Sequence, residues 1–125
     1  MITGIVNVQL EVTLRLTLRG PTGQIRTVNT VVDTGFDGSF TLPSALIVQL
    51  GFAWDRRARA ILADGSESVF DIYTGIVVWN RRKLAIPIHA ADTMPLVGTA
   101  LLAQHELQAE FRPRGKVTIK RLERR

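Results

Sequence analysis

An aspartate stands at the end of an apolar run, in the stretch NTVVDTGFDGSFTLP that covers residues 29 to 43. Two valines precede Asp33, and a threonine and a glycine follow it. A strand with such a run belongs in a core, where a lone carboxylate is costly unless it is paired or hydrogen-bonded. Asp33 is therefore either a turn residue before glycine, which is a common use of aspartate, or a charge kept for chemistry.

The remaining composition excludes most other kinds of catalytic site. The chain has no cysteine, which excludes disulfides, thiolate nucleophiles and cysteine-based zinc sites. The two histidines, His89 and His105, match no helical metal motif, so we expect surface or packing roles for both. The serines lack a G-x-S-x-G elbow, and no glycine-rich phosphate loop is present. We expect neither a metal nor a cofactor.

Length and composition indicate an ordinary globular protein. A chain of 125 residues suits a single domain over residues 1–125, and 46% hydrophobic with 22% charged residues are typical of soluble proteins. The first twenty residues alternate apolar with polar side chains, unlike a signal peptide or a membrane span. We therefore expect a cytoplasmic protein that does not use a membrane.

The net charge of +5 raises the question of a nucleic-acid partner, because basic residues are concentrated in the last fourteen positions. Phe111 is the one aromatic side chain near them, so stacking platforms for bases are almost missing. The basic residues flank the alternating segment KVTIKRL, which favours a solvated strand face or a frayed tail. Nucleic acid is not the partner we expect.

Alternating and β-branched segments dominate the chain and predict an all-β fold. The alternation from Val6 to Arg19 predicts one long half-buried strand, and GPTGQ then turns the chain into a second strand, 25–32, that ends at Asp33. Asp64 and Gly65 form a two-residue hairpin signal between strands at 59–62 and 69–73. These features predict a hairpin that projects from the fold.

The other segments complete a fold of about eight short strands with one or two short helices. Pro43 and Ser44 open a short helix that stops at Gly51, and Thr99 is the predicted N-cap of a helix that extends to His105. The further predicted strands cover 75–79, 83–89 and 95–98, followed by a terminal hairpin of strands 107–111 and 116–122.

Three of these segments, in this order, resemble the retropepsin-like aspartic proteases, the single-lobed dimeric relatives of pepsin. VVDTG at 31–35 matches the catalytic loop, ILADGS at 61–66 the flap, and PLVGTALL at 95–102 the glycine-bearing strand and the helix behind the site. The resemblance extends from about Val6 to Ile119. It implies the retropepsin-like acid-protease fold, a closed barrel-like monomer with one or two short helices.

The resemblance also implies an activity, that of an aspartic endopeptidase acting on extended, largely apolar peptide segments. In this family two carboxylates share one proton, and one chain here supplies one such aspartate. The implied catalytic residues are Asp33, Thr34 and Gly35, and the implied partners are a second copy of the chain and a peptide or protein substrate. Homodimerisation is then a requirement of the mechanism.

Substrate contacts are implied for both the loop and the flap. The residues concerned are Phe36, Asp37, Ala63, Asp64, Gly65 and Ser66. Phe36 stands where viral members usually carry alanine or serine, and Thr99 stands where they carry an arginine that braces the aspartate equivalent to Asp37. Asp37 either holds the substrate backbone or is the first half of an Asp-Gly turn. The alternative function is a catalytically silent dimerisation or peptide-binding module.

Overall fold

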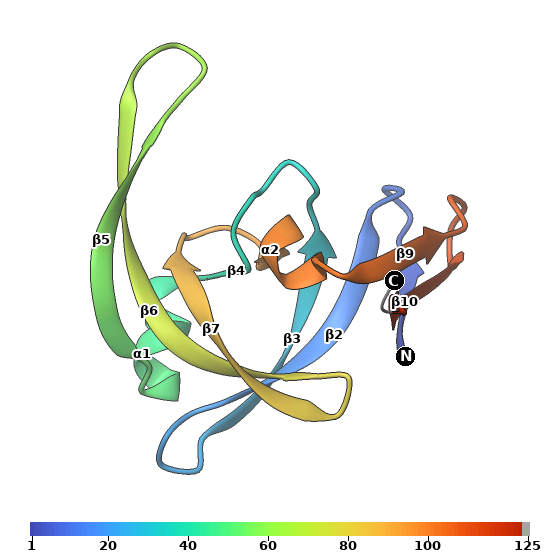
Figure 1. Ribbon diagram of the computed structural model, residues 1–125, viewed down its shortest axis with the longest axis horizontal. Coiled ribbons are helices and arrows are strands. Elements are labelled where there is room, and N and C mark those ends of the chain that lie inside the picture. Colours follow the sequence, from blue (N-terminus) through green and yellow to red (C-terminus); the bar gives the residue numbers. More distant parts are fainter. Residues whose placement is uncertain (124–125) are drawn as a thin grey trace.

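The computed structural model describes residues 1–123 and consists mainly of β-strands (Figure 1). The strands are β1 (Ile2–Val6), β2 (Val12–Arg19), β3 (Ile25–Val32), β4 (Phe40–Leu42), β5 (Ala53–Ile61), β6 (Glu67–Trp79), β7 (Arg82–Ala90), β8 (Leu96–Val97), β9 (His105–Ala109) and β10 (Lys116–Arg121). Two short helices, α1 (Ser44–Leu50) and α2 (Thr99–Leu102), complete the fold. The predicted all-β class is confirmed.

Six of the strands close into a barrel. All strands belong to one sheet, in the order β5-β6-β7-β4-β8-β3-β2-β1-β10-β9. An additional pairing of β2 with β6 closes the six consecutive strands β6-β7-β4-β8-β3-β2 into the barrel. Alternate side chains of these strands point inward and form the core. The innermost side chains include Leu14, Leu18, Phe40, Leu42, Ile47, Ile88 and Val97.

The strand β8 holds the end of β3 in place. It lies between β3, with which it runs parallel, and β4, with which it runs antiparallel. Thr41 on β4 fixes β8 further, because its hydroxyl accepts a hydrogen bond of 2.9 Å from the main-chain N–H of Leu96. The carboxyl end of β3, where Asp33 follows, is thereby anchored in the barrel wall.

A long hairpin formed by β5 and β6 projects beyond the barrel (Figure 1). The projecting hairpin predicted around Asp64 and Gly65 is confirmed, and its strands are longer than predicted. The predicted strands 69–73 and 75–79 are one continuous strand of 13 residues, β6, which is paired with β5 and with β7. The inner end of β6 is part of the barrel wall, so the hairpin is a continuation of the barrel itself.

The prediction of one strand from Val6 to Arg19 is wrong. β1 ends at Val6 and β2 begins at Val12, and the intervening turn is built on Asn7. The Asn7 side-chain oxygen accepts hydrogen bonds from the main-chain N–H groups of Gln9 and Glu11. Side-chain periodicity does not detect this turn, because the apolar residues inside it keep the spacing of a strand.

The terminal strands pair within the chain. β10 lies between β1 and β9, and the predicted terminal hairpin is confirmed as β9 and β10. The last two basic residues of the tail, Arg124 and Arg125, lie outside the described residues. Neither helix in residues 1–123 has the length and apolar character needed to cross a membrane.

Candidate active site

Asp33 is the first residue after β3, and both its main chain and its side chain are fixed. Its N–H donates to the carbonyl of Val97 on β8 at 2.9 Å, which continues the parallel pairing of β3 with β8. One carboxylate oxygen, Oδ1, accepts the N–H of Gly35 at 2.9 Å. The residue is half-buried at the end of the barrel strand.

The loop between β3 and β4 is attached to the first turn of α2. Thr99 donates its N–H to the carbonyl of Phe36 at 2.9 Å, and Ala100 donates to the carbonyl of Gly38 at 3.1 Å. These loop carbonyls accept hydrogen bonds from the first N–H groups of the helix, which a capping side chain would otherwise accept. The prediction of Thr99 as N-cap is wrong, because Gly98 is the N-cap residue and makes no side-chain cap bond. The helix is also shorter than predicted and ends at Leu102.

Two glycines allow this close packing of main chain on main chain. A Cβ atom added to Gly98 would lie 2.2 Å from the carbonyl oxygen of Gly38. A Cβ atom added to Gly38 would lie 2.5 Å from the ring of Phe36 and 2.7 Å from the ring of His89. All three distances are below any ordinary contact, so the loop, α2 and the two rings approach this closely because neither residue has a side chain.

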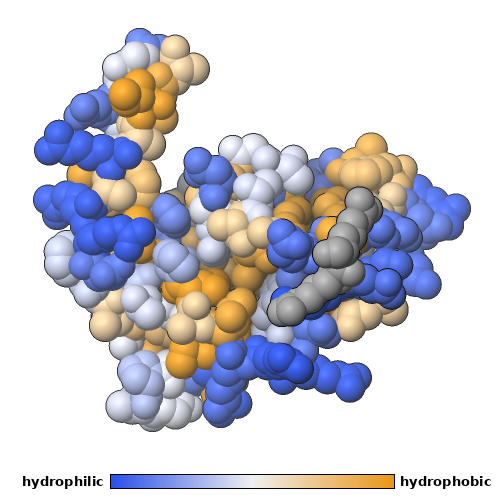
Figure 2. Space-filling model, in the orientation of Figure 1, coloured by the Kyte–Doolittle hydropathy of each residue, from blue (hydrophilic) through white to orange (hydrophobic). Residues whose placement is uncertain are grey.

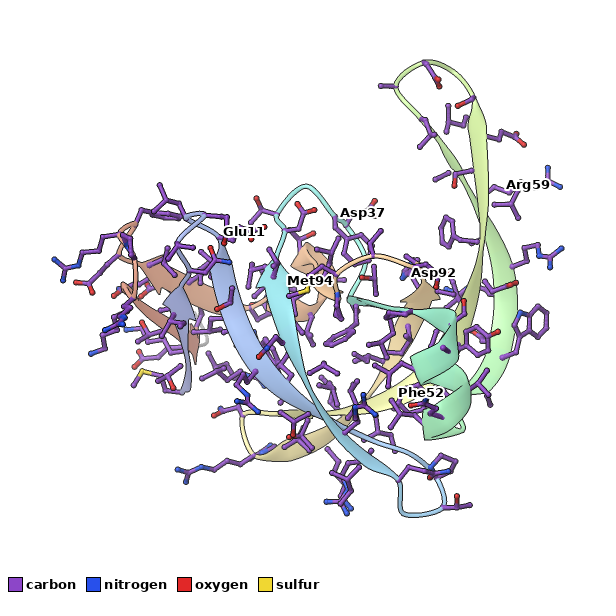
Figure 3. All side chains as sticks on the ribbon, turned by 180° about the vertical axis from the view of Figure 1, so that it is seen from behind. Glu11, Asp37, Phe52, Arg59, Asp92 and Met94 are labelled. Atoms are coloured by element: carbon purple, nitrogen blue, oxygen red, sulfur yellow. The ribbon has the colours of Figure 1, made fainter. Side chains whose placement is uncertain are left out.

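The residues beside Asp33 face solvent. Thr34, Gly35 and Asp37 are exposed, and the Thr34 hydroxyl makes no hydrogen bond with any residue of 1–123. In Figure 3 Asp37 lies on the side of the loop that faces the hairpin. Thr99 has no cationic group to brace Asp37, and its hydroxyl instead makes a long bond of 3.4 Å to the carbonyl of Phe36. The structure thus brings Asp33, Thr34, Gly35, Phe36 and Asp37 together on one fixed loop.

Phe36 packs inward on His89. The two rings meet edge-on with centroids 5.2 Å apart, and on its other side His89 lies 5.0 Å from the ring of Phe70 on β6. Burial lowers the pKa of His89, while the main chain of Phe40 and the Asp37 carboxylate act in the opposite direction. Nδ1 of His89 is buried and has no hydrogen-bond partner among the described residues.

The contact of His89 with both phenylalanines was not predicted. The sequence indicated only that His89 packs or lies on the surface, and its place near the end of an alternating strand gives no sign of contact with the loop and the hairpin. To predict this contact, one must know which strands pair with β7. In the sheet, His89 lies opposite Thr41 of β4 on one side and opposite Ile72 of β6 on the other.

The hairpin tip is a well-formed turn of its own. The N–H of Leu62 donates to the carbonyl of Ser66 at 2.8 Å, and Gly65 adopts a φ of 85°, in the left-handed region that favours glycine. Asp64 accepts both the N–H and the hydroxyl of Ser66 on one oxygen. These hydrogen bonds lower the pKa of Asp64.

The tip does not contact the loop in this structure. No hydrogen bond within residues 1–123 joins the residues 63–66 to the residues 33–38. Figure 2 shows that the outer half of the hairpin stands clear of the rest of the molecule. The structure therefore places the predicted flap residues, Ala63, Asp64, Gly65 and Ser66, together on one turn and apart from Asp33.

The two faces of the hairpin differ in character. Paired residues share a face, so Phe70, which contacts His89, shares the inner face with Ala58, Ala60 and Ser68. The outer face carries two ion pairs, Arg57 with Asp71 and Arg59 with Glu67, and Arg59 points away from the loop in Figure 3. The inner face, which is turned to the barrel, therefore carries small and aromatic side chains at these positions, and Arg56, which pairs with Ile72, lies nearer the base of the hairpin.

Within residues 1–123 no group of three histidine, aspartate or glutamate side chains is arranged to hold a metal ion. No protein-family model, no curated protein and no solved structure matches the chain.

Proposed function

We propose that the protein is a retropepsin-like aspartic endopeptidase that works as a homodimer and cuts extended, largely apolar peptide segments. The observation that carries the proposal is the position of Asp33. Its carboxylate is half-buried at the end of a barrel strand and oriented by the N–H of Gly35, beside the exposed residues Thr34 and Gly35. The bond from Gly35 is that of an Asx turn, and the main-chain bond from Asp33 to Val97 fixes this turn on β8 at the end of the barrel wall.

The chemistry follows from two such carboxylates at close range. Like charges so near to each other cannot both stay ionised, so the pair holds one proton between them. The ionised carboxylate removes a proton from a water molecule, whose oxygen attacks the carbonyl carbon of the peptide bond, while the protonated carboxyl donates to the carbonyl oxygen. Collapse of the tetrahedral intermediate breaks the C–N bond, and the leaving amine takes up a proton.

The second carboxylate comes from a second copy of the chain. Each chain contributes one Asp33, and the exposed Thr34 hydroxyl next to it is free to donate across a two-fold axis. In the viral relatives the chain ends interleave in the dimer, but here β10 already pairs with β1 of its own chain. The contacts between subunits are therefore assigned to the loop at 33–37 and to the open edge of β9, the last strand of the sheet.

The hairpin supplies the other side of the substrate site. A peptide laid between it and the loop meets Ala58, Ala60, Ser68 and Phe70 on the inner face of β5 and β6, which suits apolar side chains. Movement of the tip toward the loop would exclude water from the reacting bond. Phe36 occupies the space above Gly38 and Gly98, so its ring forms part of the wall beside the substrate.

The test compares the wild-type protein with Asp33→Asn, using a mixed library of peptides between about pH 4 and pH 7. Asp92→Asn is the matched control, because its amide oxygen can still accept the hydrogen bond from Ser44 that Asp92 accepts. We expect cleavage by the wild type and the control, and none by Asp33→Asn. Light scattering on the same samples is expected to show a dimer in all three.

Two results would contradict the proposal. A wild-type protein that is dimeric but as inert as Asp33→Asn supports the alternative, a silent dimerisation or peptide-binding module. The replacement of the bracing arginine by Thr99, whose side chain reaches only Phe36, is the observation that favours this alternative. Cleavage by a strictly monomeric protein would refute the shared pair of aspartates.

A further inference from the structure

A groove of about 840 Å³ lies between β7, the turn that precedes it, α2 and the adjoining ends of β9 and β10. Its lining consists of Ser39, Trp79, Asn80, Arg82, Lys83, Leu84, Ile86, Ala100, Leu101, Ala103, His105 and Arg121. The volume is within the usual range for ligand sites. None of the residues 33–37 or 63–66 lines it, so the groove is separate from the candidate active site.

One wall of the groove is an open strand edge. β7 pairs with β6 from Arg82 to His89, but its other edge pairs with β4 only from Ile88 to Ala90. Residues 82–87 therefore have no strand on that side within the described chain, and of these Pro87 has no N–H to donate, which leaves residues 82–86 for pairing. In an antiparallel pair every second residue directs its N–H and carbonyl away from its partner strand. An extended peptide can pair with these groups as an added strand.

The charge of the groove is positive and unbalanced. Arg82, Lys83 and Arg121 line it, no aspartate or glutamate does, and none of the three forms an ion pair with a residue of 1–123. The hairpin arginines Arg57 and Arg59 differ, because each has an acidic partner. The three cations therefore favour a ligand that brings its own carboxylates.

The rest of the lining is largely aliphatic. Leu84 provides the exposed apolar surface, and the buried Ile86 and Leu101 form the floor beneath it. Figure 2 shows apolar residues on this face of the barrel, with strongly hydrophilic residues along the turn between β6 and β7. Trp79 donates its indole N–H to Nε2 of His105 at 3.2 Å, and Nδ1 of His105 lies 2.8 Å from the carbonyl of Ala103. These polar groups are satisfied internally, so polar contacts with a ligand come from the cations and the β7 main chain.

We propose that this groove binds an acidic peptide segment in extended conformation, paired as an additional strand with residues 82–86 of β7. Arg82, Leu84 and Ile86 share one face of β7, so the apolar side chains of the peptide lie over Leu84 and over the buried Ile86 and Leu101 on that face. Its alternating carboxylates meet Lys83 on the other face, and a carboxylate at the end of the peptide meets Arg82 and Arg121. Single-stranded nucleic acid fits less well, because it requires exposed aromatic rings for stacking and the one aromatic lining residue, Trp79, is buried. The site does not depend on the proposed peptidase activity.

The probe is a fluorescein-labelled short peptide that alternates glutamate with valine or leucine, and binding is followed by fluorescence anisotropy and by amide NMR shifts. The same peptide with lysine in place of glutamate tests the charge. A version with N-methyl groups at every second residue tests strand pairing, and single-stranded oligothymidine tests the competing class of ligand. Every measurement is made on the wild type and on Asp33→Asn, so that cleavage of the probe cannot be mistaken for a failure to bind.

We expect saturable binding of the acidic peptide to both proteins, with the largest amide shifts at residues 82–86 and 100–103. The double variant Arg82→Glu/Lys83→Glu is expected to weaken binding about tenfold or more. The double variant Arg15→Glu/Arg26→Glu changes the net charge equally at sites outside the groove and is expected to bind like the wild type.

Several outcomes overturn the proposal. Equal binding of the lysine peptide, equal loss in both double variants, or shifts located elsewhere would show that the groove is not the site. Undiminished binding of the N-methylated peptide would refute pairing with β7. Tighter binding of oligothymidine than of the acidic peptide would assign the groove to nucleic acid.

Discussion

The ring of Phe36 meets the imidazole of His89 edge-on, with centroids 5.2 Å apart and ring planes at 86°. Because Phe70 lies against the same imidazole, one side chain connects the loop that carries Asp33 with the base of the projecting hairpin. The loop is held by main-chain hydrogen bonds to α2 and β8, and the tip of the hairpin makes no hydrogen bond to it. His89 is therefore placed to couple the position of the hairpin to the position of the loop.

Truncation of His89 is expected to destabilise the fold. His89→Ala leaves both phenylalanine rings without their common contact, and we expect a loss of about 2 kcal/mol in the free energy of unfolding. His89→Leu retains an apolar side chain of comparable size and is expected to lose less than half as much. Urea denaturation of the three proteins at neutral pH measures both values. Equal stability of His89→Ala and the wild type would show that the contact contributes nothing.

The lowered pKa of His89 makes the stability of the protein depend on pH. Burial is the main cause, so the imidazole takes up a proton at lower pH in the native state than in the unfolded state, whose pKa is close to 6.5. The unfolded state binds more protons as the pH falls below that value, so stability decreases until the native pKa has been passed. Above the unfolded pKa the group makes no pH-dependent contribution.

We therefore expect the free energy of unfolding of the wild type to fall more steeply on acidification than that of His89→Leu. The measurement is the urea midpoint of both proteins at closely spaced pH values below neutrality. The difference between the two curves isolates His89, since the carboxylates titrate in both proteins. Parallel curves would contradict the assignment.

Gly98 and Gly35 are expected to respond differently to replacement by alanine. In Gly98→Ala the new Cβ would lie 2.2 Å from a main-chain oxygen that cannot move without displacing the loop, so we expect a loss of about 3 kcal/mol or more. In Gly35→Ala the nearest atom is Oδ1 of Asp33 at 3.2 Å, at the end of a side chain. That variant is expected to stay within about 1 kcal/mol of the wild type.

Thermal or urea unfolding measures the stability of both variants, and the peptide cleavage assay compares their rates of cleavage. Gly35→Ala presses on the carboxylate, so we expect it to fold normally and to cleave slowly. If both variants are equally stable, the close packing of the loop on Gly98 is not what holds the site together.

Local patterns in the sequence were sufficient for much of the fold. The helix that begins after Pro43, the strand that ends before Asp33 and the turn at Asp64 and Gly65 were all predicted, because each depends on residues adjacent in the chain. The turn between β1 and β2 was missed, since Val8 and Leu10 keep the spacing of a strand while both are exposed in a loop. The chain turns here despite that periodicity, because the side chain of Asn7 accepts hydrogen bonds from the main-chain N–H groups of Gln9 and Glu11.

The candidate site was predictable in part. The placement of Asp33 at the end of β3 follows from the sequence, and so does the grouping of its neighbours on one loop. The contact of His89 with Phe36 and Phe70 does not, because it depends on β7 pairing with both β4 and β6. The open edge of β7 could not be foreseen either, since it exists only because β4 is three residues long.

The turn between β1 and β2 offers a gain in stability. Leu10 adopts a φ of 63°, in the left-handed region, and its side chain is half exposed. Glycine adopts this conformation without steric cost, so Leu10→Gly is expected to raise the free energy of unfolding by about 0.5 kcal/mol. Val8→Gly, in the same turn, is the control and is expected to destabilise. A loss of stability in Leu10→Gly would mean that its exposed side chain has a packing role.

The hairpin tip is expected to open independently of the barrel. Asp64→Ala removes both hydrogen bonds from Ser66, yet no described residue outside the tip depends on them. We therefore expect faster hydrogen exchange at the amides of Leu62 and Gly65, with an unchanged urea midpoint. Glu67→Ala, which removes the exposed pair with Arg59, is the control and is expected to leave those amides unchanged. A lower urea midpoint for Asp64→Ala would instead show that the tip and the barrel unfold as one unit, and a hairpin of that kind could not move over a bound peptide without disturbing the fold.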